Sequence, residues 1–128
     1  MSGVVVDASA IVALLFREPA ASGVLAAIPV GATLHAPPLL ALEVANIART
    51  KVRRKELTEP DAEMLLDELD RWRVRAIPVP WRSAWKLAWK HDLTVYDAAY
   101  LHVAIARDLP LVTLDVDLHA AAGRRARP

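Results

Sequence analysis

The sequence predicts an α/β fold in which a central parallel sheet of four to five short strands carries helices on both faces. Short β-branched segments, such as Val4-Val5-Val6 and Leu111–Leu114, alternate with longer segments whose apolar residues recur at helical spacing. This alternation is typical of β–α–β units. The 128 residues are enough for one domain with a proper core, and the chain contains no internal repeat and no low-complexity linker.

The first half of the chain is predicted to contain two strands and four helices. Proline and glycine mark several boundaries, since Pro19 opens the second helix and Pro29 and Gly31 end it. Thr58, followed three residues later by Asp61, resembles a pattern that caps the start of a helix. We expect strands at 3–7 and 33–36 and helices at 8–16, 20–28, 39–54 and 58–72.

The second half is predicted to contain two further strands and three helices. Residues 73–79 alternate weakly between apolar and polar, and Pro78 and Pro80 close that strand. We expect strands at 73–79 and 111–114 and helices at 82–90, 97–107 and 118–124. Residues 1–123 would then form the single domain, and residues 124–128 a flexible basic tail.

The composition excludes several classes of protein. The absence of cysteine excludes disulfides and thiolate-bound zinc. No apolar segment reaches the roughly 18 residues that a membrane span needs, and the start of the chain does not read as a secretory signal. A formal net charge of +1 is not that of a strongly basic nucleic-acid binder. We therefore expect a cytoplasmic protein without a membrane partner.

Four acidic residues interrupt apolar segments, where an ionised carboxylate is costly unless something pairs with it. Asp7 and Asp115 end strands, Asp97 begins a helix, and Glu43 lies in the early turns of the helix that follows the second strand. In an α/β sheet these places lie along the same edge. Any one of the four acids alone would also suit a helix cap or a buried ion pair.

Four carboxylates at one edge would need a counter-charge. Two of them about 4 Å apart repel each other by roughly 4 kcal/mol at an effective dielectric constant near 20. Either protons are taken up or a cation binds. Because the donors are all oxygen atoms, the pattern favours Mg²⁺ or Mn²⁺ over zinc.

Four segments together resemble the PIN-domain family, and most of all the VapC-type toxins of prokaryotic toxin–antitoxin pairs. They are Val5–Ala10, Leu42–Asn46, Thr94–Tyr100 and Leu111–Asp115, and their order and spacing cover the full length of the chain. The resemblance implies a three-layer PIN-like fold, Mg²⁺- or Mn²⁺-dependent endonucleolytic cleavage of RNA that leaves a 5′-phosphate and a 3′-hydroxyl, homodimers, and neutralisation by a cognate VapB-type antitoxin.

The resemblance also places the site. The family's four acidic positions map onto Asp7, Glu43, Asp97 and Asp115, and two flanking hydroxyl positions map onto Ser9 and Thr113. We expect the three aspartates to contact metal directly or through water. Glu43 would bind through water or at a second metal, or would orient the attacking water. The sequence leaves open whether one or two metal ions act.

Other residues allow more than one interpretation. Asp117 could reach the metal or could start the next helix, and Ser9 could bind phosphate or a metal-bound water or could cap the first helix. The four histidines are interpreted as packing or surface residues; they are His35, His91, His102 and His119.

Three tryptophans recur at four-residue intervals, at Trp81, Trp85 and Trp89. Core packing is the favoured interpretation, with a dimer or antitoxin groove as an alternative and base stacking as a third. Candidates for contacting RNA phosphates are Arg53, Arg54, Arg82 and Lys86.

Two other functions are weighed within the same fold: a non-catalytic protein-interaction module, and a PIN nuclease that processes RNA without an antitoxin. The four acids argue against the non-catalytic module, because without chemistry they would only cost stability. Phosphotransfer receivers are disfavoured because Asp7 has no acidic neighbour and no lysine follows Lys90. A haloacid-type phosphatase needs an acid where this chain has Ser9.

Overall fold

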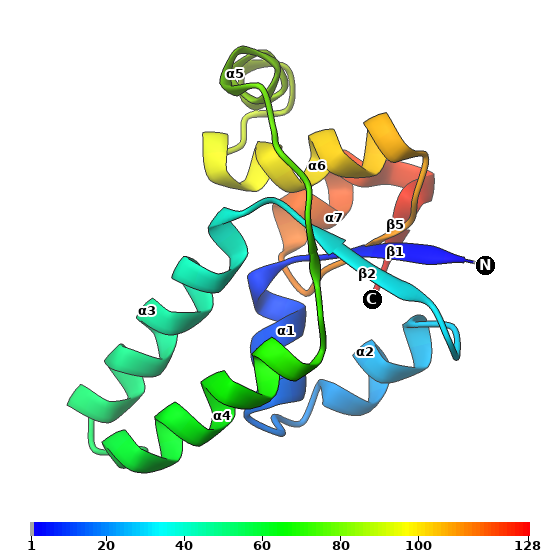
Figure 1. The fold of residues 1–128 in the computed structure, drawn as a ribbon. Coiled ribbons are helices and arrows are strands. Elements are labelled where there is room, and N and C mark those ends of the chain that lie inside the picture. Colours follow the sequence, from blue (N-terminus) through cyan, green and yellow to red (C-terminus); the bar gives the residue numbers. More distant parts are fainter. Residues whose placement is uncertain (1) are drawn as a thin grey trace.

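Residues 2–128 are described by the computed structural model, and they form a five-stranded parallel sheet with helices on both faces (Figure 1). The strand order is β3-β2-β1-β4-β5, which places β1 at the centre, and every pairing is parallel. The predicted α/β class is therefore confirmed. The strands are β1 (Gly3–Val6), β2 (Thr33–Ala36), β3 (Arg75–Ala76), β4 (Leu111–Val112) and β5 (Ala126–Arg127).

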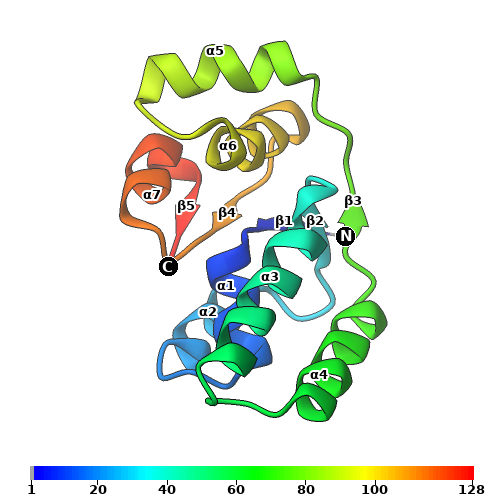
Figure 2. The same ribbon diagram turned by 90° about the vertical axis from the view of Figure 1, so that its left-hand side faces the viewer.

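The helices form a layer on each side of the sheet (Figure 2). The first layer contains α1 (Ala8–Leu15), α2 (Ala21–Ala27), α3 (Leu39–Arg53) and α4 (Glu59–Arg71). The second contains α5 (Trp81–His91), α6 (Val95–Arg107) and α7 (Val116–Ala122), with α6 against β1, β2 and β4. Within residues 2–128 none of these helices has the length and apolar character needed to cross a membrane.

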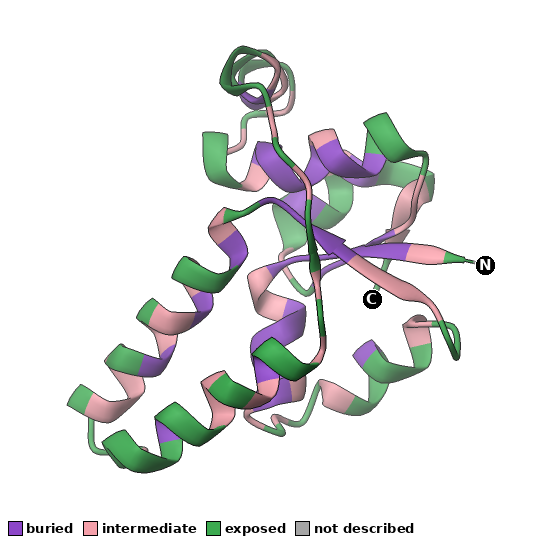
Figure 3. Cartoon of the chain, viewed as in Figure 1, coloured by how far each residue is buried: buried purple, intermediate pink, exposed green. Residues whose placement is uncertain are grey.

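The core lies around β1, whose residues Val4, Val5 and Val6 are at most 1% exposed. A central parallel strand is covered on both faces, so a continuous β-branched run suits it. Ile11 of α1 and Leu101 of α6 belong to the same buried cluster. Figure 3 shows the buried segments of the central strand and of these helices in purple. This packing holds the end of β1 rigidly, and with it the residue that follows.

Helices α6 and α7 each begin two residues earlier than expected. Thr94 caps α6 by accepting a hydrogen bond from the Asp97 N–H at 3.0 Å, and Asp115 caps α7 by accepting one from the Leu118 N–H at 2.8 Å. Asp97 therefore lies in the first turn of α6, and Asp115 immediately precedes α7.

Strands β3 and β4 are shorter than the strands expected at 73–79 and 111–114. Pro78 has no backbone N–H to donate, so the β3 ladder ends before it. Beyond β4, the Leu114 N–H donates to Ser9 Oγ at 2.9 Å instead of to a neighbouring strand. The chain thus leaves the sheet early in order to contact the start of α1.

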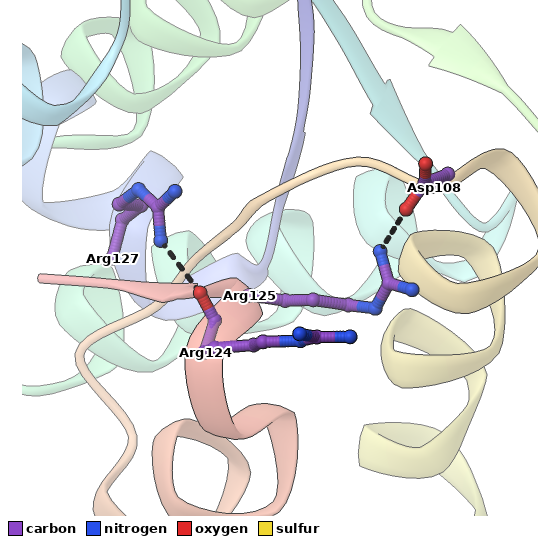
Figure 4. A network of polar contacts seen from close by, with 4 residues as sticks. All are labelled: Asp108, Arg124, Arg125 and Arg127. Atoms are coloured by element: carbon purple, nitrogen blue, oxygen red, sulfur yellow. Dashed lines mark hydrogen bonds and ion pairs between the residues drawn. The ribbon is translucent and has the colours of Figure 1, made fainter.

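The C-terminal residues correct the expectation of a basic tail over 124–128. Residues 126–127 form β5 at the edge of the sheet, where the Arg127 carbonyl accepts a hydrogen bond from the Thr113 N–H at 3.3 Å. Arg125 pairs with Asp108 at 2.6 Å, which lowers the pKa of that carboxyl (Figure 4). The fold therefore continues past residue 123.

The three tryptophans of α5 correct the interpretation that they pack in the core. Trp81, Trp85 and Trp89 are 67%, 51% and 73% exposed. Helix α5 instead buries Ala84 and Ala88 in a small apolar cluster with alanines of α6. The small side chains face the neighbouring helix, so the large ones on the adjacent face remain in solvent.

The approach of β1 to β2 gives the first prediction. A Cβ atom at Gly3 would lie 2.8 Å from His35 Nε2 and 2.9 Å from Thr33 Oγ1. Gly3→Ala should therefore lower the free energy of unfolding by about 1–3 kcal/mol, as overpacking does. Gly23→Ala, where the added Cβ atom meets nothing within 4 Å inside α2, should raise it by about 0.5–1 kcal/mol.

Denaturant unfolding of both variants measures these changes. Equal stability of the Gly3 variant and the parent protein would contradict the close approach.

Candidate active site

The four acids lie on the elements that meet at the carboxyl edge of the sheet. Asp7 directly follows β1, Asp115 follows β4, Glu43 is in the second turn of α3 and Asp97 is in the first turn of α6. Their charges act on one another. The charge of Asp115 contributes to the raised pKa values of Asp7 and Asp97, and the charges of Asp97 and Asp7 contribute to that of Glu43. Residues far apart in the chain are thus near enough for their charges to interact.

Asp7 is the most buried of the four acids, with 4% of its surface exposed. Its Oδ1 accepts hydrogen bonds from Ser9 Oγ at 2.7 Å and from the Ala10 N–H at 3.0 Å, while Oδ2 accepts one from Thr113 Oγ1 at 2.5 Å. Burial raises the pKa of Asp7 above its ordinary value of 3.8, and the three donors oppose that rise. All three bonds favour the ionised carboxylate.

The hydroxyls of Ser9 and Thr113 each already donate their proton in a hydrogen bond. Ser9 Oγ donates to Asp7 and accepts from the Leu114 N–H at 2.9 Å, and Thr113 Oγ1 donates to Asp7 and accepts from the Asp115 N–H at 3.0 Å. A hydroxyl has one proton to give, so the 3.5 Å separation between the two hydroxyl oxygens is a contact rather than a hydrogen bond. Both side chains are therefore oriented by Asp7.

Asp7 itself caps α1, so Ser9 does not fill the capping role that the sequence left open. Ser9 instead connects α1 to the segment after β4. A contact between Ser9 and phosphate or a metal-bound water stays a prediction. Asp117 is exposed in the first turn of α7, and its charge contributes to the raised pKa of Asp97. Participation of Asp117 in the site also stays a prediction.

Tyr100 is a site residue that the sequence reasoning missed. Its hydroxyl donates to Glu43 Oε1 at 2.6 Å, and its side chain is 1% exposed. Burial raises the pKa of Glu43 above its ordinary value of 4.5, and the hydrogen bond from Tyr100 opposes that rise. The available signal was a phenol one helical turn after Asp97, which puts both on one face of α6.

The histidines do not join the acids. His35 is buried, with Nε2 at 2.8 Å from Thr33 Oγ1, and burial lowers its pKa. Its Nδ1 has no hydrogen-bond partner within residues 2–128. His91 and His102 are half-buried, and His119 is exposed.

Within residues 2–128 none of the four acids forms an ion pair. The ion pairs among residues 2–128 are Lys51–Glu18 and Arg125–Asp108, and neither involves the site. As the side chains stand, no three Asp, Glu or His residues in this part of the chain are close enough to form a ready ligand set. The acids therefore influence one another's pKa values without forming a ready ligand set in this part of the chain.

The donor chemistry fits a hard divalent cation. Glu43 Oε2 and Asp115 Oδ2 make no hydrogen bond with residues 2–128, Asp7 Oδ2 accepts only one, and the carboxylate of Asp97 has a single side-chain partner, Thr94. Each acid thus keeps an oxygen with lone pairs to offer. Oxygen donors that lack a protein counter-charge are what Mg²⁺ and Mn²⁺ bind.

A comparison with known protein families gives a match over most of the chain. The model of the PIN domain family matches residues 4–124. This chain belongs to the PIN-domain family. The resemblance inferred from its motifs is confirmed, because those motifs lie within the matched residues.

Curated relatives of this PIN domain are named as VapC ribonucleases. It is 39% identical over 118 residues to ribonuclease VapC3 of Pyrobaculum aerophilum, covering 89% of this chain and 90% of the relative. It is 36% identical over 126 residues to ribonuclease VapC1 of Mycobacterium tuberculosis, covering 96% and 93%. Within its family the chain groups with the VapC proteins.

Solved structures show the same fold. The crystal structure of PAE2754 from Pyrobaculum aerophilum superposes with a TM-score of 0.75 at 25% identity, covering 95% of this chain and 86% of that one. Mycobacterium tuberculosis VapC20, described as a toxin that cleaves the sarcin–ricin loop, superposes with a TM-score of 0.72 at 21% identity, covering 98% and 100%. The three-layer PIN-like architecture is thereby confirmed.

The raised pKa of Asp97 predicts how stability depends on pH without metal. Burial and then the charge of Asp115 raise this pKa above 3.8 in the folded protein, so the folded state binds a proton more tightly than the unfolded state. The stability contributed by this proton is complete below pH 3.8 and is lost as pH rises through the folded-state pKa. Asp97→Asn should therefore raise Tm more at pH 7.5 than at pH 4.5 in EDTA.

Thermal unfolding at the two pH values measures this difference, with Asp67→Asn on the exposed surface of α4 as the control. The pH sensitivity attributed to Asp97 would be refuted if its variant followed the parent protein at both pH values.

Proposed function

We propose that this PIN domain is a metal-dependent endoribonuclease, the toxin of a toxin–antitoxin pair, which hydrolyses RNA phosphodiester bonds. The observation that carries the proposal is a group of four carboxylates that act on one another and form no ion pair within residues 2–128. The names of the curated relatives support the ribonuclease activity.

A divalent ion bound by these acids would lower the pKa of a coordinated water and neutralise charge on the phosphate. The residues of the chain supply orientation. Asp7 is held by Ser9 and Thr113, so its remaining lone pair has a fixed direction. Tyr100 holds Oε1 of Glu43, and this leaves Oε2 to bind metal through water or to orient the attacking water.

The free energy needed to bury the ionised acids supports a catalytic role over that of a non-catalytic protein-interaction module. Burial is the largest cause of the raised pKa values of Asp7, Glu43 and Asp97, so keeping these residues ionised opposes folding. A module that only bound other proteins would gain nothing from this arrangement.

The partners in this proposal are an RNA substrate, a cognate VapB-type antitoxin and a second copy of the chain in a homodimer. The relatives' names support the first two. The homodimer follows from the family resemblance. Acting on cellular RNA would place the protein in the cytoplasm.

Asp7→Asn tests the catalytic assignment. The variant should lose RNA cleavage, because an amide is a much weaker ligand than a carboxylate, while the packed core around β1 preserves the fold. Cleavage of an RNA substrate in Mg²⁺ by the purified protein measures the activity, and the parent protein's products should carry 5′-phosphate and 3′-hydroxyl ends.

Circular dichroism of the variant provides the control for folding. Cleavage that persists in a well-folded Asp7→Asn protein would remove Asp7 from the catalytic set.

Tyr100→Phe tests the support of Glu43 through metal binding instead of activity. Mn²⁺ should raise the parent protein's Tm, since a ligand that binds only the folded state stabilises it. Tyr100→Phe should need several-fold more Mn²⁺ for the same rise, because Glu43 loses the donor that fixes its orientation. Asp97→Asn should show a smaller rise at every concentration.

Tyr96→Phe is the matched control, since Tyr96 lies on the same helix with 67% of its surface exposed. A parent protein whose Tm does not respond to millimolar Mg²⁺ or Mn²⁺ would count against the metal site itself.

A further inference from the structure

Helix α5 presents aromatic and positive side chains in two adjacent stripes. Trp81, Trp85 and Trp89 are all more than half exposed, and each is followed by an exposed cation. The four-residue repeat keeps each set on one side of the helix. The cations are Arg82, Lys86 and Lys90.

Within residues 2–128 both stripes remain largely exposed. The ion pairs within residues 2–128 involve none of the three α5 cations. The rings of Trp85 and Trp89 meet edge to face with centroids 5.8 Å apart, and the Arg82 guanidinium lies 4.6 Å from the centroid of the Trp81 ring. Much of the ring surface therefore remains in water, which is unusual unless it serves a partner.

The aromatic stripe leads toward the acids. Residues 92–94 connect α5 to the N-terminal end of α6 (Figure 2), and Asp97 lies in the first turn of that helix. Tyr96, next to Asp97, is 67% exposed and continues the series of accessible rings. A strand that follows α5 toward its C-terminal end would thus be led to the first turn of α6, which carries Asp97.

We propose that α5 is the platform that binds single-stranded RNA for this PIN domain. Unpaired bases stack on Trp85 and Trp89, while Arg82, Lys86 and Lys90 bind the backbone phosphates. Aromatic rings and cations alternate along α5, just as bases and phosphates alternate along an RNA strand, so the two can pair along their length. This assignment rests on the proposed ribonuclease function and adds that the substrate is unpaired where it crosses α5.

Charge favours RNA over a second copy of the chain at this face. Residues 81–91 contain three Lys or Arg residues and no acid. If two copies packed α5 against α5 about a two-fold axis, like charges would face each other. A polyanion meets the same stripe with opposite charge and offers a flat ring to each exposed indole.

The test is RNA binding in EDTA, where the absence of metal prevents cleavage. A labelled, unstructured 12-nucleotide RNA is titrated and followed by anisotropy and by tryptophan fluorescence. Trp85→Leu should weaken binding by roughly 5- to 100-fold, the range of a lost base–aromatic stack, whereas Trp85→Phe should keep most of the affinity. Trp89→Leu and Trp89→Phe provide a second pair.

The phosphate contacts have their own measurement. Lys86→Gln should reduce the slope of log affinity against log salt by about 0.7, because one fewer counterion is released from a single strand. Arg71→Gln, an exposed cation at the end of α4 in the other layer, should leave both affinity and slope unchanged.

Three outcomes overturn the platform. The first is that both Leu variants bind RNA as tightly as the parent protein. If the parent protein still cleaves RNA in that case, the ribonuclease proposal stands without the platform. A Leu variant that sediments as a monomer where the parent is a dimer, with unchanged RNA binding, makes the face an interface between copies. A parent protein that neither binds nor cleaves RNA removes both proposals.

Discussion

The Asp7 carboxylate is the point on which the site depends. Its three donors come from the start of α1 and from Thr113 after β4, so one side chain joins segments more than a hundred residues apart. Thr113 and Ser9 then accept the backbone N–H groups of Asp115 and Leu114. The carboxylate of Asp7, which is costly to bury, thus helps to position Asp115, the acid that follows β4. The short β4 strand is a consequence, because the chain leaves the sheet to make these bonds.

The same arrangement explains why the fold around the site is so apolar. The raised pKa values of Asp7, Glu43 and Asp97 show that the folded state resists holding these groups ionised. The opposing stabilisation comes from fully buried residues such as those of β1, whose side chains are excluded from water on both faces of the sheet. The packed layers stabilise the fold, and the buried carboxylates at the edge shared by these layers destabilise it.

The sequence singled out the four acids as candidates and predicted most elements because both inferences depend on local rules. A carboxylate within an apolar run conflicts with burial wherever it occurs, and Asp7, Glu43, Asp97 and Asp115 could be found on that ground alone. The contact between Tyr100 and Glu43 could not, since it depends on how α3 and α6 cross. The exposure of the α5 tryptophans also escaped prediction. Periodicity shows that three side chains share a face, but which face meets α6 was decided by the small Ala84 and Ala88.

Although the net charge is only +1, the chain carries its acidic and basic residues in separate regions of opposite charge. A cluster of carboxylates repels phosphates, so an enzyme that cleaves a polyanion there must hold the polyanion with other residues. Helix α5 carries cations without acids and connects directly to the helix that carries Asp97. Attraction and repulsion then act on different parts of one strand: α5 would hold the backbone, and the acids would admit a phosphate only together with a divalent ion. Binding and cleavage would thereby be separable, which explains how a nearly neutral domain can be a nuclease.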